Sequence, residues 1–167
     1  DVQKYVREAE SLIARGAGRS YGDCAVNESL TVSTLGLNEI LHWDADTGEL
    51  IAEAGLMLSE VIAAFLPSGW FPFVTPGTKF VTLGGAIATN VHGKNHHVDG
   101  AFGDHVNWID LVLPSGELQR CSREENEDLF NWTIGGMGLS GIICRCSIQL
   151  RPVESGWISQ EVVVNRD

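Results

Sequence analysis

Short stretches in which hydrophobic and polar positions alternate occur along the whole chain, and this period of two predicts β-strands. The expected strands cover residues 12–14, 30–33, 49–54, 106–113, 117–121 and 142–150. The turn Asp44 to Gly48 predicts a hairpin-like segment formed by 30–33 and 49–54. Pro114-Ser115-Gly116 predicts a second hairpin over 106–121. A last strand-like run, Gln160 to Val164, has no partner following it.

Helices are predicted where apolar positions recur every three or four residues, or where the composition favours them. They are expected over residues 2–12, 59–66 and 126–133, with a short helix opening at Ala86. Ser59 is the expected N-cap of the second helix, and Pro67-Ser68-Gly69 ends it. Because the helices are mixed with antiparallel hairpins and no regular βαβ repeat occurs, we predict an α+β fold.

The composition fits one domain, or two small lobes that share a core, because 44% of the 167 residues are hydrophobic. Acidic residues outnumber basic ones 22 to 11, the net charge is -11, and no block of Lys and Arg occurs, so we expect no nucleic-acid partner. No apolar run approaches the ~20 residues of a membrane span, and we expect a soluble chain. Since it starts at Asp1 rather than Met and stops after a strand-like run, we expect a truncated fragment of a longer protein.

The four cysteines, Cys24, Cys121, Cys144 and Cys146, show no C-x-x-C spacing. Cys144 and Cys146 are two residues apart in a predicted strand, so they are expected to share one of its faces. We interpret all four as reduced, mostly buried thiols. The five tryptophans are expected to pack in the core or between lobes.

Glycine-rich loops occur at three places in the sequence, residues 16–22, 84–85 and 135–141. Gly84 and Gly85 lack a Cβ, so backbone N–H groups there can approach a ligand closely, and a helix start with free N–H groups is expected to bind an anion. The third loop matches the dinucleotide fingerprint G-x-G-x-x-G by letter. A helix precedes it and a strand follows it, which is the reverse of a Rossmann unit. We therefore reject a Rossmann fold, and expect that the three loops can together wrap one ligand that bears a pyrophosphate.

A dense polar tract, His92-Gly93-Lys94-Asn95-His96-His97, follows the second glycine loop. It supplies cationic, donor and proton-transfer groups, so we interpret it as a candidate reaction centre. Other interpretations stay open: a glycine-rich turn with a solvated basic tip, or a nucleotide-binding module without catalytic chemistry. A metal hydrolase using His92, His96 and His105 is disfavoured, because no Glu lies between the first two as in H-E-x-x-H. We expect no metal.

Four tracts together resemble a known family. They are Ala14-Arg15-Gly16-Ala17-Gly18-Arg19-Ser20-Tyr21-Gly22-Asp23, Pro76-Gly77-Thr78 with Thr82-Leu83-Gly84-Gly85-Ala86-Ile87-Ala88, the His92 to His97 tract, and Gly135-Gly136-x-Gly138-Leu139-x-Gly141-Ile142-Ile143. In this order they resemble the FAD-binding domain of the vanillyl-alcohol-oxidase class of flavoproteins, in the decaprenylphosphoryl-β-D-ribose 2-oxidase branch. The resemblance covers about Leu12 to Pro152.

The resemblance implies FAD, bound non-covalently between two α+β lobes, of about residues 1–75 and 76–167. One lobe would carry a small mixed or parallel sheet, and the other a larger antiparallel sheet with flanking helices. The implied cofactor-binding residues are Ala14, Arg15, Gly16, Ala17, Gly18, Arg19, Ser20, Tyr21, Gly22, Asp23, Cys24, Gly77, Thr82, Leu83, Gly84, Gly85, Thr89, Asn90, Val91, His92 and Ile143.

The resemblance also implies a reaction, the oxidation of a secondary alcohol of a sugar by hydride transfer to flavin N5, with Lys94, His92 and Tyr21 as candidate catalytic residues. The implied substrate is the 2-hydroxyl of a polyprenylphosphoryl ribose, in cell-wall biosynthesis, and an aldonolactone-oxidase-like activity is the alternative. Family members have a substrate-capping domain, which this chain lacks, so we expect the fragment to be incomplete for turnover. A reductase or epimerase partner is implied, with a location in the cytoplasm or peripheral to the bacterial inner membrane.

Overall fold

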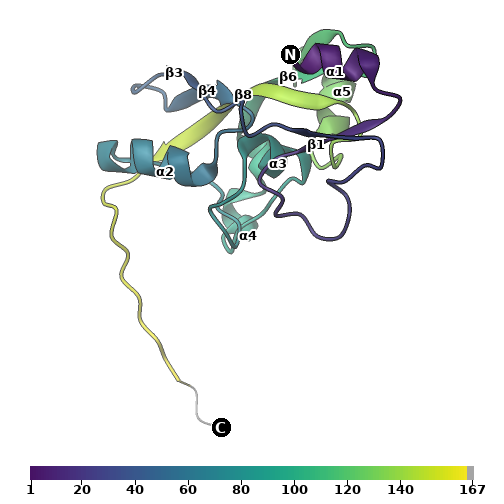
Figure 1. The fold of residues 1–167 in the computed structure, drawn as a ribbon. Helices are drawn as coiled ribbons and strands as arrows, with labels where there is room; N and C mark the ends of the chain where they lie inside the picture. Colours follow the sequence, from purple (N-terminus) through teal and green to yellow (C-terminus); the bar gives the residue numbers. More distant parts are fainter. Residues whose placement is uncertain (165–167) are drawn as a thin grey trace.

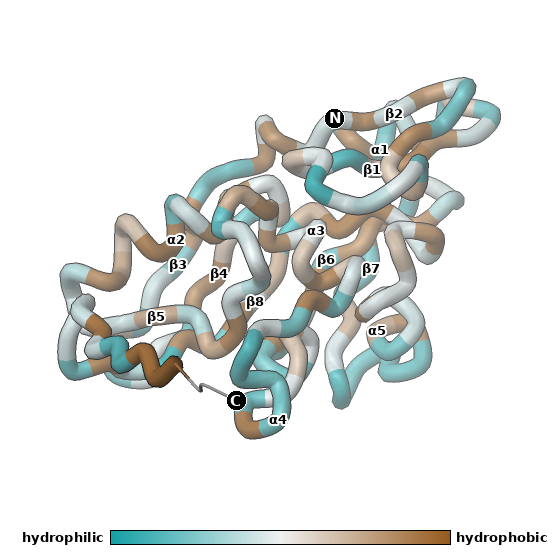
Figure 2. Tube along the Cα trace, turned by 90° about the horizontal axis from the view of Figure 1, so that it is seen from below, coloured by the Kyte–Doolittle hydropathy of each residue, from teal (hydrophilic) through white to brown (hydrophobic). Residues whose placement is uncertain are grey.

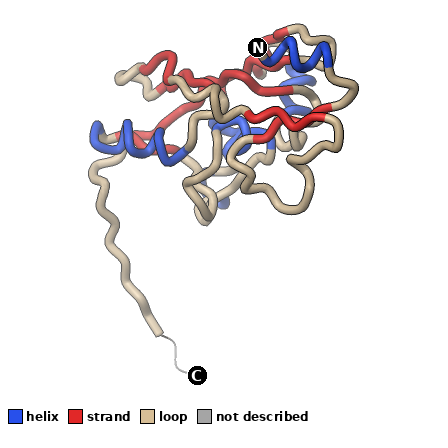
Figure 3. Tube along the Cα trace, viewed as in Figure 1, coloured by secondary structure: helices blue, strands red, loops and turns tan. Residues whose placement is uncertain are grey.

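The structure, a computed structural model, describes residues 1–164 (Figures 1 and 3). Its elements, in chain order, are α1 (Val2–Glu8), β1 (Leu12–Arg15), β2 (Leu30–Ser33), β3 (Ile40–Trp43), β4 (Glu49–Glu53), α2 (Leu58–Phe65), the 3₁₀ turn η1 (Leu66–Ser68), β5 (Trp70–Pro72), α3 (Leu83–Ala88), α4 (His96–Asp99), the 3₁₀ turn η2 (Phe102–His105), β6 (Val106–Val112), β7 (Leu118–Ser122), α5 (Glu127–Thr133) and β8 (Ile142–Pro152).

Two sheets of different kinds organise these elements. β1 and β2 form a small parallel sheet, whereas the larger sheet is antiparallel with the order β3-β4-β8-β6-β7. β8 is its central strand, since it pairs with β4 on one side and β6 on the other, and β5 pairs with its C-terminal end. The α+β prediction, with a small parallel and a larger antiparallel sheet, is confirmed. The lobe boundary near residue 75 stays a prediction, and the larger sheet takes strands from both sides of it.

The first predicted hairpin, between residues 30–33 and 49–54, does not form. β4 pairs with β3, across the turn that begins at Asp44, whereas 30–33 leaves this sheet and pairs in parallel with β1. The sequence hides β3 because it is a four-residue edge strand in which three side chains are exposed, so it shows no alternation. The second hairpin is confirmed as β6 and β7.

Three other boundaries or elements differ from the sequence prediction. α1 ends at Glu8, because the chain is extended from Ala9 and Leu12 opens β1. α2 has Met57 rather than Ser59 as its N-cap, and the Glu60 carboxylate accepts a hydrogen bond from the Met57 N–H at 2.8 Å. No strand forms over 160–164, where the chain has left the body of the fold; its apolar end is exposed (Figure 2).

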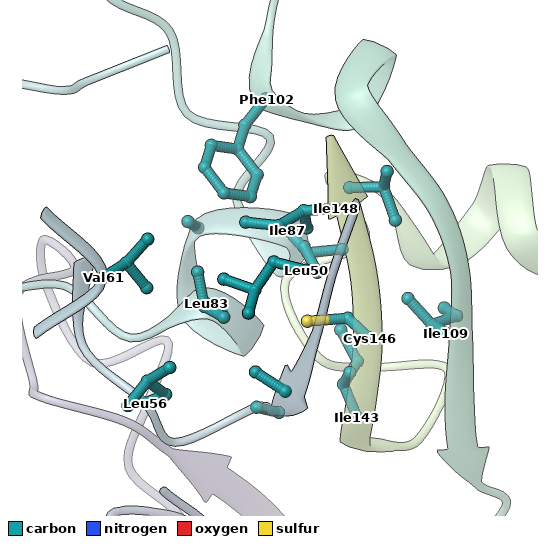
Figure 4. Packing of buried hydrophobic residues seen from close by; sticks show 14 of the residues in the cluster. Leu50, Leu56, Val61, Leu83, Ile87, Phe102, Ile109, Ile143, Cys146 and Ile148 are labelled. Carbon is teal, nitrogen blue, oxygen red and sulfur yellow. The ribbon is translucent and has the colours of Figure 1, made fainter. Parts of the chain in front are cut away.

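The main core lies between the larger sheet and the helices α2 and α3 (Figure 4). Leu50 from β4, Ile109 from β6 and Ile148 from β8 belong to the same buried cluster as Leu83 and Ile87 from α3, and all five are at most 2% exposed. A second cluster, which centres on Val32, Val112 and Ile142, packs α1 and the β1–β2 pair against the other end of the sheet. These contacts bury the apolar surface that stabilises the fold.

The tryptophans do not all pack as expected. Trp43 contacts Phe65 and Trp70 at centroid distances of 4.4 and 5.4 Å, which agrees with the prediction. Trp132 and Trp157 are 70% and 91% exposed, so the prediction that they pack in the core is wrong.

A β-bulge at Cys144 in β8 places Cys144 and Cys146 on different faces of the strand. In the pairing with β6, Asp110 lies opposite Arg145 and Leu111 lies opposite Ile143, so Cys144 is the extra residue. Before the bulge the odd-numbered position Ile143 faces the main core, and after it the even-numbered positions face that core. Cys146 therefore packs in that core, whereas Cys144 packs in the second cluster, and the prediction of a shared face is wrong.

We predict that the four free cysteines differ sharply in reactivity. Burial raises the pKa of Cys144 to about 11 and that of Cys146 to about 12, and it also raises the pKa of Cys121. At pH 8 only about one Cys144 thiol in a thousand is then a thiolate. A thiol reagent at pH 8 should modify Cys24 first and the others only after unfolding, and Cys24→Ser should abolish the fast phase. Rapid modification of more than one thiol in the folded protein would contradict this ranking.

Candidate functional site

One cavity of about 710 Å³ lies where the three glycine-rich loops meet α3. Its walls come from the loop after β1, the segment before α3, α3 with the residues that follow it, the 135–141 loop and the start of β8. The lining residues are Ala14, Gly16, Ala17, Gly18, Arg19, Ser20, Tyr21, Cys24, Ala25, Thr34, Pro76, Gly77, Thr78, Val81, Thr82, Gly84, Gly85, Ala86, Ala88, Thr89, Asn90, Val91, His92, Met137, Gly138, Gly141 and Ile143. Segments that are more than 120 residues apart in the chain thus share one cavity.

The loop after β1 presents unpaired backbone donors to this cavity. Within residues 1–164, no N–H group from Gly16 to Tyr21 donates to a protein acceptor. Gly18 has φ +64°, a conformation that favours glycine. Arg15 lies behind the loop, where its guanidinium contacts Gly18 and donates to the Ala25 carbonyl at 3.3 Å. Free N–H groups with a positive charge behind them are suited to an anionic group.

The start of α3 does not offer the free N–H groups that the sequence predicts. The N–H groups of Leu83 and Gly84 donate to the carbonyls of Leu56 and Ala54 at 2.9 and 2.7 Å. The Gly85 N–H donates to the Thr82 hydroxyl at 3.2 Å, which makes Thr82 the N-cap. These donors hold the helix in place, so they are not free as the sequence predicts. Cofactor binding at Thr82, Gly84 and Gly85, which line the cavity, stays a prediction. Gly84 is needed for a different reason, since a Cβ there would lie 3.0 Å from the Ala54 Cβ.

Two of the glycine-rich segments touch directly at Gly16 and Thr82. A Cβ on Gly16 would lie 2.2 Å from the Thr82 hydroxyl oxygen, and Thr82 is only 2% exposed. Because no side chain fits between them, the loop after β1 packs closely against the N-cap of α3.

His92 lies at the end of the cavity wall that follows α3. It forms an isolated antiparallel bridge with Ala101, and its exposed ring lies 5.4 Å from the ring of His96. Just before it, Asn90 adopts φ 42° and its side-chain oxygen accepts from the Gly103 N–H at 2.9 Å. The backbone is thus fixed on both sides of the turn that carries His92 to the cavity.

The remaining predicted residues fall into two groups. Tyr21 lines the cavity although its side chain is 97% exposed, so a ligand can reach it. Lys94 is also exposed but does not line the cavity. Four proposed cofactor residues stay outside the wall: Arg15, Gly22, Asp23 and Leu83. Leu83 is fully buried in the core, so its side chain cannot contact a ligand.

The sequence also missed residues that line the cavity. Thr34 follows β2, and its N–H and hydroxyl both contact the Arg15 carbonyl. No sequence signal marks Thr34, because its place depends on the parallel pairing of β1 with β2. Met137, Gly138 and Gly141 belong to the third glycine loop, and the sequence motif already indicated that this loop contacts the ligand.

Neither a metal centre nor a membrane-spanning helix is found in the part of the chain that the structure describes. No group of three or more His, Cys, Asp or Glu side chains there is arranged to bind an ion. His105, from the hydrolase alternative, stacks on Phe73 at 4.2 Å, and its Nε2 contacts the Asp99 carbonyl at 2.7 Å. Among residues 1–164, no helix has both the length and the apolar character required to cross a bilayer.

Glycine-rich loops around one cavity, with unpaired N–H groups on one of them, define a domain that binds a nucleotide cofactor. Sequence comparison makes this assignment specific: the chain belongs to the FAD binding domain family, which matches residues 1–122. FAD is therefore the cofactor, as predicted. The observed residues fit it, because the N–H-lined loop can accept a pyrophosphate and the three glycine-rich loops line one cavity of about 710 Å³.

Three curated relatives show how widely this domain is used. The chain is 43% identical over 93% of its length to decaprenylphosphoryl-beta-D-ribose oxidase of Mycolicibacterium smegmatis, covering 35% of that protein. It is 29% identical to L-gulonolactone oxidase of Scyliorhinus torazame, over 82% of this chain and 31% of that one. It is 27% identical to D-lactate dehydrogenase of Anaerostipes hadrus, over 83% of this chain and 30% of that protein. The chain thus spans about a third of the length of these relatives.

We predict that the close contact between Gly16 and Thr82 makes substitutions there non-additive. Thr82→Ala should cost about 1 kcal/mol of unfolding free energy, because the N-cap bond is lost. Gly16→Ala should cost about 2 kcal/mol, because the new methyl displaces Thr82. In the double variant the two Thr82 atoms nearest to the new methyl are gone and the Thr82 Cβ lies 3.3 Å away, so the total should fall short of the sum by about 1 kcal/mol.

Urea unfolding of the four proteins measures this cycle. Gly36→Ala is the matched control, because a Cβ there meets nothing within 4 Å. Its cost should stay within about 0.5 kcal/mol. Additive costs at Gly16 and Thr82 would refute the coupling.

Proposed function

We propose that this chain is the FAD-binding domain of an oxidoreductase that oxidises a secondary alcohol of a sugar, the 2-hydroxyl of a polyprenylphosphoryl ribose. The observation that carries the proposal is the arrangement of the cavity, which has N–H groups for a pyrophosphate on one wall and His92 on another. Identity of 43% to an enzyme named for decaprenylphosphoryl ribose supports this substrate class.

Bound FAD supplies a two-electron acceptor at flavin N5 for the hydride that leaves the alcohol carbon. The chain must then help to remove the hydroxyl proton. Four titratable side chains line the cavity among the described residues, Arg19, Tyr21, Cys24 and His92. Of these, the imidazole of His92 is the group that can both donate a proton and accept one in a hydrogen bond to an alcohol. His92 therefore orients the alcohol by a hydrogen bond and can accept its proton.

The substrate end is proposed to lie beside His92 and Tyr21. Lys94 is on the loop that follows His92, and its exposed ammonium can attract an anionic substrate although the chain as a whole carries a net charge of -11. This placement gives Lys94 a role in binding, and Tyr21 one in covering the reacting carbon. A polyprenyl substrate implies peripheral contact with a membrane, and the ketone product implies a reductase or epimerase that consumes it.

An aldonolactone-oxidase-like activity is the second candidate. The 29% identity to L-gulonolactone oxidase favours it, since that relative is by name an oxidase of an aldonolactone. The cavity walls do not discriminate between the two. The choice depends on residues beyond the cofactor site, and comparing a phosphoribosyl lipid with an aldonolactone as substrate decides it.

We predict that the purified chain binds FAD reversibly, because all three glycine-rich loops line one cavity. Titration with FAD should shift the flavin absorbance and quench its fluorescence with one equivalent per chain. Acid precipitation should then release all yellow colour into the supernatant. No uptake would refute FAD binding by this chain, and colour that stays with the precipitate would refute non-covalent attachment.

We also predict different effects from His92 and Lys94 in a chimera that joins this domain to the remaining two thirds of the Mycolicibacterium smegmatis relative. His92→Gln should lower the rate of alcohol-dependent flavin bleaching by at least about a hundredfold, the contribution expected of a proton-transfer group. Lys94→Met should mainly raise the KM, because Lys94 lies outside the cavity. The unchanged chimera serves as the reference. A larger loss of kcat from Lys94→Met than from His92→Gln would reverse these roles.

A further inference from the structure

Residues 92–101 form a loop whose first residue, His92, lines the cavity. The bridge between His92 and Ala101 closes its base, and the Phe102 N–H donates to the Val91 carbonyl at 2.9 Å beside it. The loop contains the four-residue helix α4, which buries no residue, and Val98 on it is 77% exposed. Apolar packing therefore does little to fix the conformation of this loop.

A polar network centred on Asp99 fixes the loop instead. The Asp99 Oδ2 accepts hydrogen bonds from the Asn95 Nδ2 at 2.6 Å and from an Arg151 N–H at 3.1 Å. The Asp99 carbonyl lies 2.7 Å from the His105 Nε2. The side chains of Asp99 and Arg151 are 20% and 36% exposed, so the ion pair is partly shielded from water. We call Asp99, Asn95, Arg151 and His105 the Asp99 network.

The Asp99 network ties the loop to two distant parts of the fold. Arg151 lies at the end of the central strand β8, 52 residues away from Asp99 in the chain. Asn95 also donates to the Phe73 carbonyl at 2.9 Å, and His105 stacks on the Phe73 ring. Gly93 is buried against the same segment, where a Cβ would lie 2.8 Å from the Thr75 carbonyl. The polar tract from His92 to His97 is thus divided into anchors, Gly93 and Asn95, and exposed side chains that the anchors orient.

We propose that Asp99 and Arg151 are positioning residues for the His92 end of the cavity. Neither lines the cavity. Their ion pair sets the conformation of the 92–101 loop and so aims His92 at the part of the ligand that reacts. This inference rests on the proposed function, in which the flavin ring occupies the His92 end and the pyrophosphate lies at the loop after β1.

Breaking the ion pair between Asp99 and Arg151 should loosen the His92 end of the cavity and leave the loop after β1 unchanged. Arg151→Met leaves the Asp99 carboxylate with Asn95 alone, and it removes the attachment to β8. A charge-assisted hydrogen bond typically contributes enough to change an equilibrium by about tenfold or more. The loss should therefore appear in the binding of the flavin part of the ligand, while the phosphate contacts at Gly16 to Tyr21 stay intact.

The test compares FAD with ADP, which lacks the flavin, as ligands of the purified chain. Arg151→Met and Asp99→Asn should each weaken FAD binding by about tenfold and change ADP binding by less than about twofold, and Arg151→Lys should restore most of the FAD affinity. The matched control is Arg120→Met, because Arg120 and Asp110 form an ion pair at 2.8 Å on β7 and β6, outside the cavity wall. This control should leave both affinities within about twofold.

A second readout needs no ligand. The His92 ring should give one sharp set of proton resonances in the unmodified chain, and broadened or doubled signals in the Arg151 variant. Equal loss of FAD and ADP affinity in the Arg151 variant, or no change in either, overturns the positioning role. Failure of the unmodified chain to bind FAD overturns the proposed function itself, and with it this inference.

Discussion

Hydrogen bonds at both ends of α3 determine where the walls of the cavity meet. At its start, carbonyls from the segment after β4 accept the first two N–H groups, and Thr82 caps the third. At its end, the carbonyls of Ile87 and Ala88 accept from the N–H groups of Gly135 and Met137 at 3.1 and 2.8 Å. A helix of six residues is not stable alone, so these bonds and the burial of Leu83 and Ile87 keep it folded. The third glycine loop thereby reaches the cavity because it is hydrogen-bonded to the end of α3.

This arrangement separates the donors that hold the fold from the donors that can bind a ligand. The N–H groups at the start of α3 are used within the protein, which makes this wall rigid. The N–H groups from Gly16 to Tyr21 have no protein acceptor among the described residues, and they can stay unpaired because the loop is open to water. Binding a phosphate there replaces water rather than breaking protein hydrogen bonds. A rigid wall opposite an open, N–H-lined loop is consistent with binding of the FAD pyrophosphate.

The sequence predicts the parts of the site that depend on local backbone chemistry and misses those that depend on pairing between distant segments. Glycine content marked all three loops, because close backbone approach needs residues without a Cβ. The partner of β4 was missed, since β3 is short and exposed and carries no pattern. The anchoring role of Asn95 was also missed, because its acceptors include the Phe73 carbonyl, 22 residues away, and Asp99, whose other partner is Arg151. Residue types alone could not distinguish this anchor from the exposed histidines beside it.

The central strand β8 connects the two ends of the site, and its bulge is what makes this possible. Ile143, before the bulge, lines the cavity, and Arg151, eight residues later, binds the loop that carries His92. After the bulge, the even-numbered positions Cys146, Ile148 and Leu150 face the main core. Without the extra residue at Cys144, the same alternation would turn Ile143 away from the core and from the cavity. One inserted residue in the strand thus lets a single element contribute to the cavity wall at its start and support the His92 loop at its end.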